Sequence, residues 1–131
     1  MIVVDTNVLI DWHRYAHDPA EQYGASILSR AELEFGINAA PDPTTAAARR
    51  SHLNALDARI DWLPFDTAAS RSYGVLAAAV RAAGAPAQTR RTDTYIAAQA
   101  HALGAALMTE NTDDFAHLAR LLQILRPASP D

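Results

Sequence analysis

Short runs of apolar residues alternate with longer segments of helical periodicity along this chain. The first run, Ile2–Val4, consists of β-branched residues and ends at Asp5, a pattern typical of a buried strand. In the next segment, Thr6–Tyr15, the apolar residues fall on one helical face. The pattern predicts a strand followed by a helix, and it repeats to the other end of the chain.

The later elements are delimited by capping and helix-breaking residues. Ser29 is the expected N-cap of the second helix, and Pro41 follows the end of that helix. The further predicted strands are Ala25–Leu28, Ile60–Phe65, Ala105–Met108 and Leu122–Leu125. The further predicted helices span about 29–40, 44–58, 69–83, 93–103 and 111–118, with a loop at 85–92.

Strands that are short apolar runs and alternate with helices indicate an α/β fold. The expected architecture is a short central parallel sheet with helices on both faces. We expect one domain over 1–131, with its core at about 2–126 and a short C-terminal tail. Ligands of such folds bind at the carboxyl ends of the strands. Asp5, Asp66 and the segment 109–114 follow predicted strand ends.

Composition narrows the function classes. The 131 residues are half apolar, enough for one core, and their net charge is -4. This charge opposes nucleic-acid binding through a broad basic surface. The chain has no cysteine, which excludes disulfides, zinc-thiolate sites and thiol nucleophiles. Its first residues lack a basic leader or a long apolar run, so we expect a cytoplasmic protein without signal peptide or membrane span.

Two glutamates of the second predicted helix have different expected surroundings. Residues advance by about 100° each around a helix, so Glu32 borders the apolar arc and Glu34 lies nearly opposite. Arg30, four residues before Glu34, can pair with it on the solvated face. Glu32 is therefore the acid expected to turn inward, and its alternative role is that of a surface glutamate.

Asp5 and Asp93 each have two explanations. Asp5 can cap a helix, and Asp93 lies at the mouth of one, where the macrodipole stabilises an anion. Alternatively, carboxylates gathered at strand ends and helix starts would repel one another, and a hard cation would relieve the repulsion. Mg²⁺ prefers such oxygen ligands. His13 and His17 have a metal-binding spacing, but no third ligand accompanies them.

These segments resemble the PIN-domain family, and within it the VapC-type toxins of type II toxin-antitoxin pairs, over nearly the whole chain. The resemblance rests on four segments in order: Val3–Ile10, Ser29–Gly36, Thr92–Ala100 and Leu107–Phe115. It implies a single PIN-like domain and a metal-dependent endoribonuclease that hydrolyses RNA phosphodiesters. The three acids that it implies for the metal site are Asp5, Glu32 and Asp93.

The fourth acidic position departs from the family pattern. Many members have a further aspartate where this chain has Asn111. Asp114, one helical turn later, can supply the missing charge and take part in catalysis. The resemblance gives supporting roles to Thr6, beside the first acid, and to Thr109, which can orient water or a carboxylate. Whether the site holds one metal ion or two stays open.

The resemblance also implies a cofactor and partners. Mg²⁺ is expected, with Mn²⁺ able to substitute, and the substrate is RNA, with transfer RNA as one candidate. A VapB-type antitoxin is expected to inhibit the site through a groove on the early helices, and a homodimer is expected. The alanine-rich stripe Ala69–Ala83 suits close packing in the core or across that dimer. Arg90 and Arg91, with Arg30 as a third candidate, are expected to contact RNA phosphates; the alternative is solvated surface charge.

Two other functions stay open. A phosphatase similar to the haloacid dehalogenases would use Asp5 as nucleophile, but it would need an aspartate at Asn7 and a lysine, and the chain has no lysine. A non-toxin or degenerate PIN domain that acts in RNA processing, or only binds, is conceivable because of Asn111.

Overall fold

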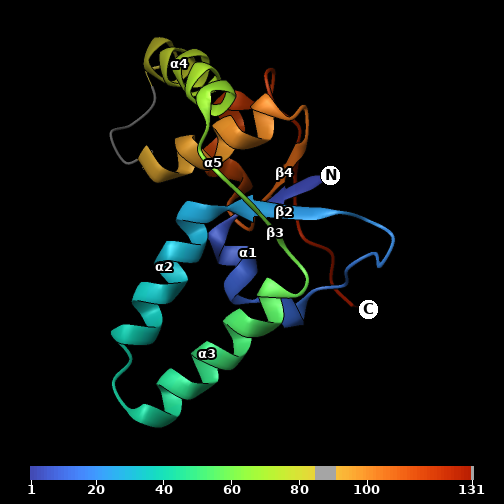
Figure 1. The fold of residues 1–131 in the computed structure, drawn as a ribbon. Helices are drawn as coiled ribbons and strands as arrows, with labels where there is room; N and C mark the ends of the chain where they lie inside the picture. The colour runs from blue at the N-terminus through green and yellow to red at the C-terminus, as the bar shows by residue number, and fades with distance from the viewer. Residues whose placement is uncertain (85–90, 131) are drawn as a thin grey trace.

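The central element of the fold is a five-stranded parallel sheet, seen in a computed structural model that describes residues 1–84 and 91–130 (Figure 1). The strand order is β3-β2-β1-β4-β5, and every neighbouring pair is parallel. The strands are β1 (Ile2–Val4), β2 (Tyr23–Ser26), β3 (Asp61–Leu63), β4 (Ala106–Met108) and β5 (Ile124–Leu125). The predicted α/β class with a parallel sheet is confirmed.

Helices cover both faces of this sheet (Figure 1). They are α1 (Thr6–Ile10), α2 (Ile27–Asn38), α3 (Pro43–Asp57), α4 (Thr67–Ala82) and α5 (Arg91–Ala102), with 3-10 turns η1 (Trp12–Arg14) and η2 (Thr112–Leu118). Val3 belongs to an apolar cluster with Leu76 of α4, whereas Val4 belongs to a cluster with Leu56 of α3. Neighbouring strand residues point to opposite faces, so β1 contributes to both cores. No helix among the described residues is long and apolar enough to cross a bilayer.

The alanine-rich stripe of α4 packs in the core along its first part. Ala69, Ser72 and Leu76 are buried, and the Ser72 hydroxyl lies 2.7 Å from Nδ1 of His101 on α5. The first part of the stripe thus packs against α5, whereas Ala82 and Ala83 at its end are exposed.

The start of α2 differs from the prediction. Its N-cap is Ser26, whose Oγ accepts a hydrogen bond from the Leu28 N–H at 3.0 Å, so Ser29 is not the cap. The preceding strand ends at Ser26 and not at Leu28, because that hydroxyl starts the helix two residues earlier. Ser29 is instead fully buried, 2.7 Å from the hydroxyl of Thr6.

Other boundaries differ for local reasons. The first helix ends at Ile10 and is followed by the tighter turn η1, where the Trp12 carbonyl accepts a hydrogen bond from the Tyr15 N–H. The predicted helix 111–118 is also a 3-10 turn. Asp66 caps α4 by accepting a hydrogen bond from the Ala69 N–H at 2.9 Å, so α4 begins at Thr67.

Candidate active site

Asp5 lies at the carboxyl end of the central strand. Its backbone N–H donates to the Met108 carbonyl at 2.9 Å, which extends the pairing of β1 with β4 by one residue. Only 4% of Asp5 is exposed. One carboxylate oxygen accepts a hydrogen bond from the Thr6 N–H, and the other accepts one from the Thr109 hydroxyl, both at 2.8 Å. Asp5 is therefore both a helix cap and a fixed carboxylate at the sheet edge.

Burial raises the pKa of Asp5 above its ordinary value. The hydrogen bonds from Thr109 and Thr6 act in the opposite direction, and the charges of Glu110 and Asp114 raise the pKa further. A carboxylate in a buried and acidic environment is stabilised in its ionised form by a nearby cation.

The Thr109 hydroxyl connects Asp5 to the segment after β4. It accepts a hydrogen bond from the Asn111 N–H at 3.1 Å and lies 3.5 Å from Nδ2 of Asn7. Because these neighbours are donors, the hydroxyl proton is directed to Asp5. Thr109 thus orients the carboxylate, a role that the sequence analysis gave to it through the resemblance.

Glu32 reaches the site from α2. It lines the same cavity as Asp5. Glu32 is exposed, however, and Glu34 is half-buried, so the expectation that Glu32 turns inward while Glu34 lies on the solvated face is wrong as to burial. The reason is that α3 lies beside Glu34, which pairs there with Arg50. Glu34 lies on another face and forms ion pairs with Arg30 at 3.2 Å and Arg50 at 2.7 Å. The pairing of Glu34 with Arg30 is the one that helical spacing predicted.

Asp93 comes from the first turn of α5. The helix begins at Arg91, two residues before the predicted start, and Asp93 is half-buried. A carboxylate at a helix N-terminus is stabilised by the macrodipole. The 3-10 turn η2 contributes Asp114 to the cavity. Asn111, the residue that precedes η2, also lines the cavity.

These groups surround one cavity of about 450 Å³. Four carboxylates line it, from residues Asp5, Glu32, Asp93 and Asp114, together with the amides of Asn7 and Asn111. No lysine, arginine or histidine is among its lining residues in the described part of the chain. The described residues also contain no group of three His, Asp or Glu side chains arranged to hold a metal ion by themselves. The acids thus share a cavity but do not converge on one closed set of ligands.

Sequence reasoning missed several lining residues. Asn7, Ile10, Thr92, Ile96 and Phe115 also form the wall of the cavity. Asn7 and Ile10 lie within one or two helical turns of Asp5, so helical spacing could have found them. Phe115 and Ile96 look like ordinary core residues in the sequence, and no signal there separates them from the rest of the core.

The three arginines expected to contact RNA have different positions. Arg90 lies outside the described residues. Arg91 is exposed at the first position of α5. Arg30 is not among the lining residues of the cavity, because its guanidinium donates two hydrogen bonds to Asp57, both at 2.9 Å. Arg30 thus pairs with carboxylates of α2 and α3 and lies away from the lining of the cavity.

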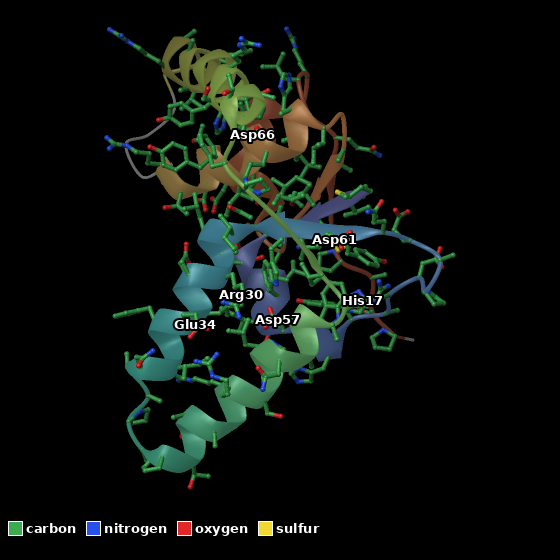
Figure 2. All side chains as sticks on the ribbon, in the orientation of Figure 1. His17, Arg30, Glu34, Asp57, Asp61 and Asp66 are labelled. Atoms are coloured by element: carbon green, nitrogen blue, oxygen red, sulfur yellow. The ribbon has the colours of Figure 1, made fainter. Side chains whose placement is uncertain are left out.

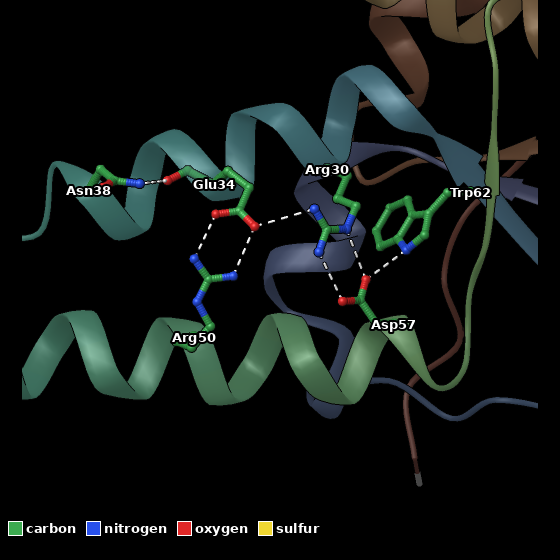
Figure 3. A network of polar contacts seen from close by, with 6 residues as sticks. All are labelled: Arg30, Glu34, Asn38, Arg50, Asp57 and Trp62. Carbon is green, nitrogen blue, oxygen red and sulfur yellow. Dashed lines mark hydrogen bonds and ion pairs between the residues drawn. The ribbon is translucent and has the colours of Figure 1, made fainter.

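Arg30 belongs to an ion-pair network between α2 and α3 (Figures 2 and 3). Arg50 donates to both carboxylate oxygens of Glu34, at 2.8 and 2.7 Å. Asp57 also accepts a hydrogen bond from the Trp62 indole at 2.8 Å. These bonds lower the pKa of Glu34, chiefly through Arg50, and that of Asp57, chiefly through Arg30. The network fixes the helix that carries Glu32.

A PIN-domain family model matches residues 2–121 of the chain. The chain therefore belongs to the PIN-domain family. Within that family it is similar to two curated relatives that are named as VapC ribonucleases. It is 34% identical to VapC ribonuclease Y4jK of Sinorhizobium fredii over 99% of both chains. It is 33% identical to Ribonuclease VapC4 of Mycobacterium tuberculosis, over 85% of this chain and 86% of that protein.

Solved structures agree with this placement. VapBC-5 from Mycobacterium tuberculosis, described as a member of a family of toxin-antitoxin systems, matches with a TM-score of 0.77 and 29% identity, over 95% of this chain and 96% of that one. A DNA-bound VapBC from Salmonella typhimurium matches with a TM-score of 0.80 and 20% identity, over 95% and 96% of the two chains. The second likeness is one of fold alone.

Proposed function

We propose that this chain is a divalent-metal-dependent endoribonuclease and the toxin of a VapBC-type pair. The observation that carries the proposal is the cavity into which β1, α2, α5 and η2 bring four carboxylates. The ribonuclease names of the relatives and the toxin-antitoxin neighbours support the activity and the biological role.

The donor chemistry of the cavity fits Mg²⁺, with Mn²⁺ as a substitute. Mg²⁺ takes oxygen ligands, keeps several waters and is bound through one or two carboxylates plus substrate phosphates. Carboxylates that share a cavity without forming a closed ligand set suit such binding. Asp5, Glu32 and Asp93 are the proposed ligands, with Asp114 and the Asn111 amide beside them.

The acids of the cavity and the groups that hold them have proposed parts in phosphodiester hydrolysis. A bound divalent ion supplies a water that is more easily deprotonated and stabilises charge on the phosphate and the leaving oxygen. Thr109 and the Thr6 N–H hold Asp5 with both oxygens oriented. Glu32 and Asp93 reach the cavity from different helices. A bound cation would add attraction for phosphate inside this acidic cavity.

Arg91 is the proposed contact to an RNA phosphate next to the site. It is exposed and lies two residues before Asp93. An arginine at this position can bind a neighbouring phosphate without neutralising the acids of the cavity.

We also propose a cognate VapB-type antitoxin as protein partner and a homodimer as assembly. A second cavity of about 510 Å³ lies between α1, α2 and α3 and shares Ile10 and Glu32 with the first. Its wall includes Leu33 and Leu53. An apolar groove beside an acidic site suits a peptide with apolar anchors and a basic residue.

Cleavage of single-stranded RNA tests the proposal. We expect the purified protein to cleave with Mg²⁺ or Mn²⁺, to stop with EDTA, and to lose activity in folded Asp5→Ala and Asp93→Ala variants. Cleavage retained in these folded variants would contradict the mechanism. RNA that is bound but left intact with every metal would favour the non-catalytic PIN domain that Asn111 makes conceivable.

A further inference from the structure

The segment 109–112, here called the β4 loop, is held from outside the cavity. The Tyr15 hydroxyl donates a hydrogen bond to the Glu110 carboxylate. Arg126 donates through Nη1 to the Glu110 carbonyl at 3.1 Å and through Nη2 to the Thr112 hydroxyl at 2.7 Å. Tyr15 follows η1 and Arg126 follows β5, so two segments distant in sequence contact one loop.

These contacts are on both sides of Asn111. The residue before it, Glu110, is held through its side chain and its carbonyl, and the residue after it is held through its hydroxyl. Asn111 itself is exposed and lines the cavity. Its N–H donates to Thr109, the same hydroxyl that orients Asp5. A displacement of the loop would therefore move Asn111 and, through Thr109, change the orientation of the Asp5 carboxylate.

We propose that Tyr15 and Arg126 are positioning residues that fix the β4 loop and thereby place Asn111 at the acidic cavity. This inference rests on the proposed function. Neither residue lines the cavity, so both act through the loop. The need for such contacts is physical: Asn111 has no charge, so attraction to a cation orients it less than it would orient a carboxylate.

The alternative is that both side chains only stabilise the fold. Tyr15 is half-buried and packs against an apolar cluster, but its hydroxyl makes the bond to Glu110, so Tyr15→Phe keeps the packing ring. Arg126 is exposed, and the loss of an exposed arginine changes stability little. Two control variants match these changes. Tyr73→Phe removes a hydroxyl from a ring that contacts Tyr95, and Arg81→Gln removes an exposed charge from α4.

The first measurement is steady-state RNA cleavage with Mg²⁺. We expect kcat to fall about 10-fold in Tyr15→Phe and in Arg126→Gln, with KM within about twofold, since groups that orient a metal site alter turnover at this scale. Arg126→Lys should recover part of the loss, because a lysine can still donate to one of the two acceptors. Tyr73→Phe and Arg81→Gln should keep the kcat of the parent protein.

The second measurement does not depend on activity. The side-chain amide signals of Asn111 in a ¹⁵N–¹H spectrum, assigned by their loss in Asn111→Asp, should shift or broaden in Tyr15→Phe and Arg126→Gln but not in the two controls. An unchanged Asn111 signal in both variants would overturn the inference, as would kcat losses that the controls share. If the parent protein cleaves no RNA, the proposed function fails, and the Asn111 signal still decides the positioning role.

Discussion

Asp5 shows how one residue can serve the site at the expense of stability. Its pKa is raised chiefly by burial, which means that the fold favours its neutral form. Above that raised pKa, the folded protein therefore carries a carboxylate that would be more stable in water. Metal sites commonly contain buried carboxylates, because a bound cation stabilises the ionised form over the neutral form.

Asp5→Asn is expected to abolish RNA cleavage while it stabilises the metal-free protein. In EDTA at neutral pH its Tm should exceed that of the parent, because the substitution removes a buried charge that the fold disfavours. The gain should shrink as the pH falls through the raised pKa of folded Asp5, where the parent carboxylate takes up a proton, and it should vanish below the ordinary value of 3.8. Thermal unfolding followed by circular dichroism measures both effects. A lower Tm for Asp5→Asn at neutral pH would contradict this account of Asp5.

For single residues, the sequence predicts those contacts that depend on spacing along one helix. Glu32 and Glu34 were assigned different roles from their helical angles alone. The partnership of Tyr15 with Glu110 could not be predicted, because the two residues are 95 positions apart. The same holds for Thr6 and Ser29, which are 23 apart. Spacing along the chain carries no information on such contacts.

The helix α2 separates two roles on two faces. Glu32 faces the acidic cavity, whereas Glu34 binds Arg50 and Arg30 in the network with α3. The network holds α2 against α3. Removal of its ion pairs should therefore lower the stability of the fold more than it lowers the rate of RNA cleavage.

Matched variants of these two glutamates test the separation. We expect Glu32→Gln to lower kcat by about 10-fold or more, through loss of a metal-binding charge. Glu34→Gln should lower the Tm and leave the kcat of the folded protein nearly unchanged. Cleavage assays and thermal melts on both variants give the comparison, and equal effects of the two on kcat would argue against the assignment.

The α2–α3 network also predicts a pH dependence of stability. The pKa of Glu34 is lowered, chiefly by Arg50, so its ion pairs stabilise the fold above the ordinary value of 4.5 and are lost as the pH falls through the lower folded value. The Tm difference between the parent and Glu34→Gln should therefore be largest at neutral pH and vanish in strong acid. Melts between about pH 7 and about pH 3 measure it. A difference that stays constant over this range would rule out the ion pairs as its source.

Element boundaries were predicted less well than element types. Ser29 was assigned as a cap because serine is a common cap, but Ser26 has the same chemistry and lies at the end of the strand. The continuous periodicity of Thr6–Tyr15 concealed the change from α1 to η1. Both boundaries depend on which of several nearby groups forms a hydrogen bond: the Ser26 hydroxyl at the start of α2, and the Trp12 carbonyl in η1.

For the whole molecule, alternation of strands and helices was enough to predict the α/β class. It did not predict the strand order, because that depends on how the crossovers pack and not on any single element. With β1 in the centre, the two apolar clusters lie on opposite faces of one sheet. The sheet should couple them into one folding unit.

Leu76→Ala and Leu56→Ala test this coupling on the two faces. Both side chains are fully buried, so each variant should lose about 2–5 kcal/mol of unfolding free energy. Urea unfolding should remain a single transition in both variants, whether it is followed by tryptophan fluorescence or by circular dichroism. Separate transitions for the two probes would show that the faces unfold independently.

The central claim is that the acids of the cavity bind a divalent cation for RNA hydrolysis. Calorimetric titration with Mn²⁺ tests it most directly, because it reports binding at the site without requiring the correct RNA. We predict saturable binding to the parent protein, strong weakening in folded Asp5→Asn and Asp93→Asn, and unchanged binding in Glu34→Gln. Equal Mn²⁺ affinity in all four proteins, or no binding to the parent, would contradict the account.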